Sequence, residues 1–376
     1  MPRVRLLPAA LVAASLGLVV IAPPATAGTD LVVRPGESIQ AALDAAPDGA
    51  VVTVRPGRYA ESLAITRPVT LAADPGAELT PPAAAPVNAC TLDPDAHGAM
   101  PGVCVVGQLA DPTEEASPVV VPVRDVRVSG LTVTGFSLSG VEVYGAEHAT
   151  LQSVTARGNA GGAVFVGRSS DVVIDGLQAT GNAGNGVDLH EGNAGFVVSH
   201  STVTGNRGEG IFVGDGTDGV ITHDVVSGNC AGVVALDLAL PGGHGVSGLR
   251  IDHSDVSRNN LFCPGDDEGS PSMSGNGVVL VGVRDTTVAY NRVVGNVGAT
   301  DPATGWPANV ALGGIALLDA SGFTGGSAPT GVVVEHNVVT GNQPFDVLYD
   351  GSGAGNTLEH NVCAVSTVPT ACEPGR

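Results

Sequence analysis

Short stretches in which apolar residues alternate with other residues recur along most of the chain. Each recurrence begins with a glycine, and two apolar residues separated by one position follow it. Seven segments share this frame: GVEVYG (140–145), GAVFVG (162–167), GVDLHE (186–191), GIFVGD (210–215), GVVALD (232–237), GVVLVG (277–282) and GIALLD (314–319). An asparagine column accompanies the frame, and the first four of its members are 23 or 24 residues apart: Asn159, Asn182, Asn206, Asn229, Asn259, Asn296 and Asn342.

A third column consists of the stretches VVSHSTV, VITHDVV, LRIDHSDV, TVAYNRV, VVEHNVV and TLEHNV. Two or three short β-branched stretches per repeat, separated by glycine and asparagine, are typical of a solenoid. Helical repeats would need Leu- and Ala-rich periodicity of 3.6 residues, which is absent. We therefore expect parallel strands stacked coil on coil, with Val, Ile and Leu inside. The asparagines are expected to form a ladder at a turn, because Asn tolerates the left-handed conformation and hydrogen-bonds along the stack.

These repeats resemble the right-handed parallel β-helix proteins of the pectin-lyase-like superfamily, across roughly residues 30–363. The resemblance implies an all-β fold: a single-stranded right-handed parallel β-helix solenoid with an N-terminal capping helix. The stretch LVVRPGESIQAALDAAPDGAVVTVRPGRYAE (31–61) looks like the entry region of those proteins, which places the helix at about Ser38–Ala46. A cap is needed because an open solenoid end exposes unpaired strand edges.

Residues 1–27 have the features of a secretory signal peptide: the basic start MPRVR, an apolar run and the small-residue ending ATA. Later apolar stretches are shorter than the roughly 20 residues that a membrane span requires. We expect a secreted, extracellular monomer with one parallel β-helix domain over 28–376, closed by a C-terminal cap at 363–376. Irregular loops are expected at about 80–118, 239–248, 261–276, 297–313 and 321–329.

The chain contains six cysteines, which in an exported protein favour disulfides over metal or redox roles. Several pairings are possible, and proximity along the chain favours Cys90–Cys104, Cys230–Cys263 and Cys363–Cys372.

The net charge is −21, and all 16 of the Lys and Arg residues counted together are arginines. Nucleic acid requires a basic surface, so the charge argues against it as a partner. A polyanionic substrate would need a divalent cation such as Ca²⁺ to bridge it to the protein.

The segment NGVDLHEGN (185–193) carries an acid and a histidine two positions apart within the shared frame. Because side chains alternate along a strand, inward Val187 and Leu189 would leave Asp188 and His190 outside. Aligning the frames puts Glu142, Val164 and Phe212 in the outward column of Asp188, and Tyr144, Val166 and Gly214 in that of His190. We predict Asp188, His190, Tyr144 and Glu142 as catalytic residues.

Carboxylates collect where these strands end. Glu191, Asp215 and Asp237 occupy this position in three frames, and hard oxygen donors are the ligands that Ca²⁺ prefers. We predict them as calcium ligands.

The longest loops, 261–276 and 297–313, precede the frame, whereas 239–248 and 321–329 follow it. They flank one face, whose outward residues are partly apolar. The loops either wall a substrate groove there or simply cover the apolar strip. Trp306, in one of these loops, has a flat ring suited to stacking on a sugar, and Phe212 belongs to the face itself.

The third column contains His200, His223, His253, His336 and His360, with Tyr290 in another coil. A position that recurs throughout a solenoid is expected to be architectural. The alternative is a row of copper or zinc ligands, since imidazole binds both metals. Certain exported β-helix proteins of copper maturation carry similar repeats.

The stretch NGVDLHEGNAGFVVSHSTVTGNRGEGIFV also looks like the catalytic coil of mannuronan C5-epimerases, whose signature is Y-G-F-D-P-H. Asp188 and His190 match its acid and histidine. Asn185 replaces the tyrosine, Leu189 replaces the proline, and no lysine is present to supply the cationic helper of that family. Tyr144, Arg168 or Arg207 would have to substitute, and we predict the two arginines as substrate-binding residues together with Phe212 and Trp306.

Two further enzyme patterns are weaker. GGHGVSG (242–248) resembles the Gly-His-Gly of polygalacturonases, whose other motifs are missing. Paired carboxylates such as Asp188 and Asp215 would suit inverting hydrolysis.

Three functions remain open. The first is an exported enzyme that abstracts the C5 proton of a uronate in an acidic polysaccharide, as a lyase or an epimerase, with Ca²⁺ as a possible cofactor. The second is a non-catalytic carbohydrate-binding or cell-envelope protein. The third is a metal-handling, copper-type solenoid.

Overall fold

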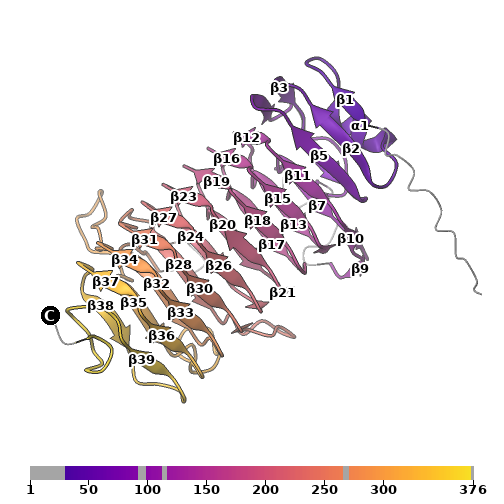
Figure 1. The fold of residues 1–376 in the computed structure, drawn as a ribbon. Helices are drawn as coiled ribbons and strands as arrows, with labels where there is room; N and C mark the ends of the chain where they lie inside the picture. The colour runs from indigo at the N-terminus through magenta and orange to yellow at the C-terminus, as the bar shows by residue number, and fades with distance from the viewer. Residues whose placement is uncertain (1–29, 92–98, 112–116, 266–270, 374–376) are drawn as a thin grey trace, which may run out of the picture.

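The computed structural model describes residues 30–91, 99–111, 117–265 and 271–373. The predicted signal peptide at 1–27 lies outside these residues. Short parallel strands stack into an elongated solenoid, with one helix at its N-terminal end (Figure 1).

Three long parallel sheets run along the solenoid. The first sheet contains β1 (Leu31–Val33), β2 (Ala50–Val54), β5 (Val69–Ala73), β11 (Arg127–Ser129), β15 (Thr150–Gln152), β18 (Val173–Asp175), β22 (Val197–Ser199), β26 (Val220–Thr222), β30 (Arg250–Asp252), β33 (Thr287–Ala289), β36 (Val333–Glu335) and β39 (Thr357–Glu359). The second sheet contains β3 (Gly57–Ala60), β6 (Ala77–Thr80), β12 (Thr132–Thr134), β16 (Thr155–Arg157), β19 (Gln178–Thr180), β23 (Thr202–Thr204), β27 (Val225–Ser227), β31 (Asp255–Ser257), β34 (Arg292–Val294) and β37 (Val338–Thr340). The third sheet contains β4 (Leu63–Ile65), β7 (Val103–Val106), β13 (Val141–Tyr144), β17 (Val164–Gly167), β20 (Val187–His190), β24 (Glu209–Val213), β28 (Ala231–Leu236), β32 (Asn276–Val281), β35 (Gly313–Leu318) and β38 (Phe345–Tyr349).

Smaller sheets lie at the turns. Two are parallel: β10 (Val123–Arg124) with β14 (Ala146–Glu147), and β21 (Asn193–Ala194) with β25 (Gly216–Thr217) and β29 (Val246–Ser247). The strands β8 (Gln108–Leu109) and β9 (Val119–Val121) pair in an antiparallel hairpin. The predicted all-β, single-stranded parallel solenoid is confirmed. The predicted irregular stretch 80–118 is not irregular throughout, because β7 joins the third sheet within it.

The core lies inside the three sheets, because alternate side chains of each strand point inward. In β20, Val187 and Leu189 are completely buried, whereas Asp188 and His190 are partly exposed. The Val, Ile and Leu of neighbouring coils stack in the same way and form one continuous core.

The asparagine column forms a buried ladder along the solenoid. The Oδ1 atom of Asn182 accepts hydrogen bonds from the backbone N and the Nδ2 of Asn159, at 3.0 and 2.9 Å. The same pattern continues coil by coil to Asn342. The predicted ladder is confirmed, but the prediction that its asparagines are left-handed is wrong. In this coil the preceding Gly181 adopts the left-handed conformation, with φ of +65°.

A second buried ladder follows the first sheet and consists of Ser201, Asp224, Ser254, Asn291, Asn337 and Asn361. Asp224 is the ionisable member. Its Oδ1 accepts a hydrogen bond from the backbone N of Ser201 at 2.7 Å, while its buried Oδ2 has no partner. Burial raises the pKa of Asp224 to about 7.

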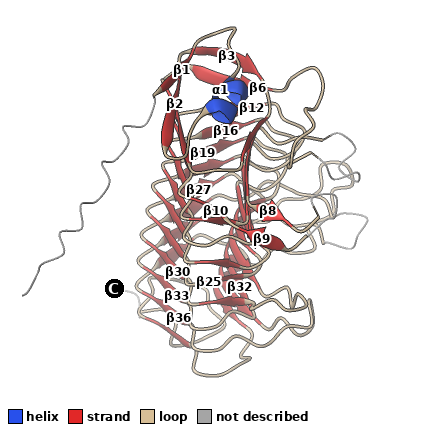
Figure 2. Ribbon diagram, turned by 90° about the vertical axis from the view of Figure 1, so that its right-hand side faces the viewer, coloured by secondary structure: helices blue, strands red, loops and turns tan. Residues whose placement is uncertain are grey.

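Both ends of the solenoid are covered. Helix α1 (Ile39–Ala45) buries Ile39 and Leu43, and Ser38 caps its first turn by accepting from the backbone N of Ala41. Figure 2 shows the helix at one end of the stack, as the sequence predicted. At the other end, the tail bonds to Asn361, whose backbone N donates to the carbonyl of Ala371 at 3.1 Å.

All three predicted disulfides are present: Cys90–Cys104, Cys230–Cys263 and Cys363–Cys372. Within the described ranges, no helix is long and apolar enough to cross a membrane.

Candidate active site on the third sheet

The strand register around Asp188 differs from the predicted alignment by one residue in one coil. Phe165 and Gly167, and not Val164 and Val166, lie beside Asp188 and His190. The glycine on which the frame was aligned, Gly162, lies one residue before the position that Gly186 has in the next coil, and Ala163 takes that position, so β17 starts one residue later. The remaining frames align as predicted.

The outer face of the third sheet is open over five strands, β13 to β28. One partly exposed residue from each strand lies along it, and we call this row the open stretch: Glu142, Phe165, Asp188, Phe212 and Val234. On the N-terminal side the next residue in the row is Cys104, which is buried and disulfide-bonded.

On the C-terminal side, the loops cover the row. Val279 and Ala316 are 6% and 1% exposed, and they form a second hydrophobic cluster outside the solenoid core. Leu312, from the loop before β35, packs against it. In these coils the loops therefore cover the apolar strip and do not wall a substrate groove over it.

Asp188 and His190 face outward, as predicted. The Nδ2 of Asn185 donates to Asp188 Oδ2 at 3.1 Å, but Asp188 Oδ1 and His190 Nε2 are both buried without a partner. Burial raises the pKa of Asp188, opposed by the nearby His190. The His190 ring meets the edge of Phe212 at 6.2 Å between centroids. A buried polar atom without a partner costs free energy, so this pair is a candidate for a functional role.

Tyr144, Arg168 and Glu191 form a connected group beside this pair. The Tyr144 hydroxyl donates to Glu191 Oε2 at 3.0 Å, and Arg168 Nε donates to the same oxygen at 3.2 Å. Burial and the charge of Glu191 raise the pKa of Tyr144 above its ordinary value, so the phenol keeps its proton. The sequence had placed Arg168 only by analogy, and the structure brings it to the site because the register of β17 is shifted.

A cleft of about 490 Å³ opens at the end of these strands. Arg168, His190, Glu191 and Asp215 line one side of it, and the loop Leu240–His244 lines the other. His244 is not among the predicted site residues, although it is the histidine of the Gly-His-Gly motif in GGHGVSG. Asp215 fixes this loop by accepting from the backbone N of His244 at 3.1 Å.

The other predicted catalytic and binding residues lie outside this cleft. Glu142 is two strands from Asp188 in the open stretch, and burial raises its pKa to about 7. The ring of Phe212, in the neighbouring strand β24, contacts the ring of His190. Arg207 is exposed just before the start of β24, at the edge of the sheet opposite the cleft. Trp306 lies in a loop several coils away.

The structure does not gather the three predicted calcium ligands. Glu191 is bonded to Tyr144 and Arg168, and Asp237 Oδ1 accepts from the backbone N of Ala239 at 2.9 Å. Among the described residues, no group of three or more His, Cys, Asp or Glu side chains is arranged to hold a metal ion. Calcium stays a prediction.

The histidine column forms a stack of rings at the turn between the first and second sheets. Neighbouring centroids from His200 to His360, through Tyr290, are 5.1–5.5 Å apart and interplanar angles are 4–22°. All six residues have positive φ. The rings stack nearly parallel, and among the described residues no three of the His, Cys, Asp or Glu side chains are arranged to hold a metal ion, which favours the architectural interpretation.

Comparisons with known proteins agree with this architecture. The family model described as a right-handed β-helix region matches residues 119–239. No curated protein matches the sequence. The A-module of the mannuronan C-5 epimerase AlgE6 of Azotobacter vinelandii superposes with a TM-score of 0.53 and 16% identity, over 90% of this chain and 95% of that one.

Two other solved structures are similar. ORF18 of Geobacillus virus E2 has a TM-score of 0.50 and 12% identity over 86% of this chain and 56% of that one. The surface protein and adhesin PfbA of Streptococcus pneumoniae has a TM-score of 0.50 and 11% identity over 86% and 91%. Likeness at such identities concerns the fold, and the chain is a right-handed parallel β-helix protein.

Proposed function

We propose that the protein acts on a uronate-containing polysaccharide by abstracting the C5 proton of a uronate unit. The observation that carries this proposal is the cleft in which Arg168, His190 and Glu191 meet, with Tyr144 bonded to Glu191. The structural likeness to a mannuronan C-5 epimerase module supports the same reaction class.

The chemistry needs three elements, and each has a candidate. Arg168 is the cation that neutralises the substrate carboxylate, which replaces Glu191 as its hydrogen-bond partner. His190 is the base for the C5 proton, held beside Asp188. Tyr144, whose raised pKa keeps it protonated, is the proton donor.

Two outcomes follow from the same first step. In a lyase, the electrons of the C5–H bond form a C4=C5 double bond, the C4–O bond breaks, and the leaving oxygen takes the Tyr144 proton. In an epimerase, Tyr144 gives its proton to the opposite face of C5, and His190 keeps the proton that it removed. Bound Ca²⁺ would neutralise further substrate charge in this acidic protein.

We also propose that the protein is secreted. The signal-peptide features of residues 1–27 and the three disulfides support an oxidising destination.

The test is incubation with a panel of uronate polymers, with and without Ca²⁺. Absorbance near 235 nm reports the unsaturated product of a lyase, and ¹H NMR reports epimerised units. Activity of either kind that is lost in His190→Gln supports the proposal. Silence in both assays, together with retained polymer binding, would favour a non-catalytic carbohydrate-binding protein, for which the existing Arg168–Glu191 pair is the supporting observation.

A further inference from the structure

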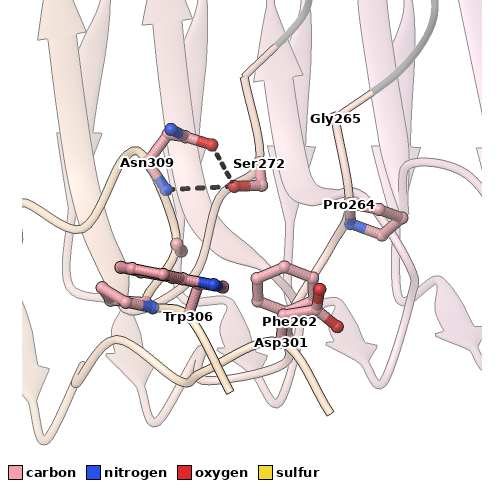
Figure 3. Close-up of a pocket in the computed structure, with 9 residues that line it drawn as sticks. Phe262, Pro264, Gly265, Ser272, Asp301, Trp306 and Asn309 are labelled. Atoms are coloured by element: carbon pink, nitrogen blue, oxygen red, sulfur yellow. Dashed lines mark hydrogen bonds between the residues drawn. The ribbon is translucent and has the colours of Figure 1, made fainter. Parts of the chain in front are cut away.

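A second pocket lies on the loops that precede β32 and β35, at the opposite edge of the third sheet from the cleft. Its volume is about 490 Å³, within the range of about 300–1,000 Å³ typical of small-molecule sites. Phe262, Ser272, Asp301, Trp306 and Asn309 line it (Figure 3). In this view Trp306 and Phe262 lie beside each other, next to the hydrogen-bonded pair Ser272 and Asn309.

The two loops are fixed to each other. The backbone N of Asn309 donates to Ser272 Oγ at 3.0 Å, and Ser272 Oγ donates to Asn309 Oδ1 at 2.5 Å. Next to Ser272, Met273 forms bridges with Val310 and with Cys263, and Cys263 is tied to the solenoid by its disulfide to Cys230. A site on such anchored loops loses little conformational entropy when a ligand binds.

Trp306 is held in place by its backbone while its ring stays uncovered. Its carbonyl accepts from the backbone N of Asp301 at 2.7 Å, and its own N donates to Thr304 Oγ1 at 3.3 Å. The residue is nevertheless 73% exposed. An exposed indole on an anchored backbone, beside a phenyl ring, provides a flat apolar platform, which suits the C–H face of a pyranose.

Hydrogen-bonding groups surround this platform. Asp301 Oδ2 accepts from Thr304 Oγ1 at 2.7 Å and its Oδ1 from the backbone N of Ala303 at 2.8 Å. These bonds lower the pKa of Asp301, which is therefore ionised. The Nδ2 of Asn309 has no partner among the described residues and is free to donate. None of the described residues that line the pocket is cationic, so a uronate carboxylate would meet only negative charge.

We propose that this pocket is a binding site for a neutral sugar unit, which stacks on Trp306 and hydrogen-bonds to Asp301 and Asn309. The site takes a different sugar class from the cleft, where Arg168 is available. The proposal does not depend on uronate chemistry at His190.

The chain offers a direct probe, because Trp306 is its only tryptophan. Titrating the protein with neutral tetrasaccharides (cellotetraose, mannotetraose, xylotetraose) should shift Trp306 emission in a saturable way for at least one of them. Tetragalacturonate should bind at least 10-fold more weakly. Asp301→Asn should reduce this difference in affinity, because it removes the negative charge that repels the uronate. The asparagine keeps an oxygen that can accept the hydrogen bonds of the turn.

Binding is measured independently by saturation-transfer NMR. Trp306→Ala should abolish the sugar signal, whereas Phe323→Ala, at an exposed phenylalanine in another loop, should keep it. His190→Gln should also keep it, so this proposal and the proposed function can fail separately. Absence of any response up to 10 mM sugar, or an unchanged affinity in Trp306→Ala, would overturn the proposal. So would an emission shift that depends only on protein concentration, which would identify a second copy of the chain as the occupant.

Discussion

The guanidinium of Arg168 lies over the ring of Tyr144, 5.8 Å from its centroid, and Glu191 bonds to both side chains. The charge of Arg168, the one arginine among the described residues that line the cleft, is thus partly neutralised by an acid of the protein itself. A substrate carboxylate must compete with Glu191 for Arg168.

Glu191→Gln should therefore lower KM for a uronate polymer severalfold, because Arg168 then has no competing anion. The same change removes the negative charge that raises the pKa of Tyr144, so the alkaline limb of the pH–rate profile should move to lower pH. Steady-state kinetics across pH measures both effects. Arg168→Gln should raise KM instead, and equal KM values in both variants would contradict the proposed role of Arg168.

His190→Gln should reduce kcat by about 10²–10⁴-fold, the usual contribution of a general base. His244→Gln is the matched comparison, since His244 lines the same cleft from the loop. A larger loss in His244→Gln than in His190→Gln would transfer the role of the base to His244. Circular dichroism checks that both variants fold.

Asp224→Asn should stabilise the protein at neutral and alkaline pH. The pKa of Asp224 is raised from 3.8 to about 7 in the folded state, so its contribution to stability is present below the unfolded value and is lost as pH rises through about 7. Asparagine can bond through both side-chain atoms at every pH, as the other asparagines of this ladder do.

We expect wild type and Asp224→Asn to be similar near pH 4, and the variant to gain about 1–3 kcal/mol above pH 7. Urea unfolding at several pH values measures this difference. Asp218→Asn, an exposed aspartate with φ of +55°, controls for the change in net charge and should show no such divergence.

His223→Gly should be more stable than His223→Ala by about 1 kcal/mol. Both variants lose the stacking on His200 and His253, but alanine keeps the cost of the left-handed conformation at φ of +58°. Glycine already occupies this turn position in an earlier coil, at Gly176 with φ of +68°. Thermal unfolding provides the comparison, and a more stable alanine variant would contradict the interpretation.

Two alanine variants of the histidine column, His200→Ala and His223→Ala, test the metal alternative. Titration with Cu²⁺ and Zn²⁺ should give equal, weak affinities for wild type and for His200→Ala and His223→Ala if the column is architectural. A loss of affinity of 10-fold or more in either variant would restore the metal-handling hypothesis.

The periodicity of the sequence was sufficient to predict the fold because each coil of the solenoid repeats the same strands and turns. The position of Val187 and Leu189 inside, the asparagine ladder and the capping helix all follow from local pattern. The register of β17 did not follow, because the frame was aligned on Gly162, whereas the buried Ala163 takes the position that glycine has in the next coil.

The site was predicted less completely than the fold. Asp188 and His190 were recognised because they depart from the repeat, but the bond between Tyr144 and Glu191 joins residues 47 positions apart in sequence. Loop residues carry no periodic signal, so sequence alone could not place His244 at the cleft or Trp306 away from it. Nor could it show that Val279 and Ala316 are covered while Phe165 and Phe212 are not.

Because the open stretch is bounded by Cys104 on one side and by loops on the other, the length of polysaccharide that it can bind is limited. Five strands at about 4.8 Å spacing leave roughly 19 Å between Glu142 and Val234. A polymer lying along this row can therefore place only a few sugar units on it before it must turn away from the protein. The open stretch thus has two fixed ends, the disulfide-bonded Cys104 on one side and the loops on the other. The smallest oligomer that fills the length between them should also be the smallest one that binds well.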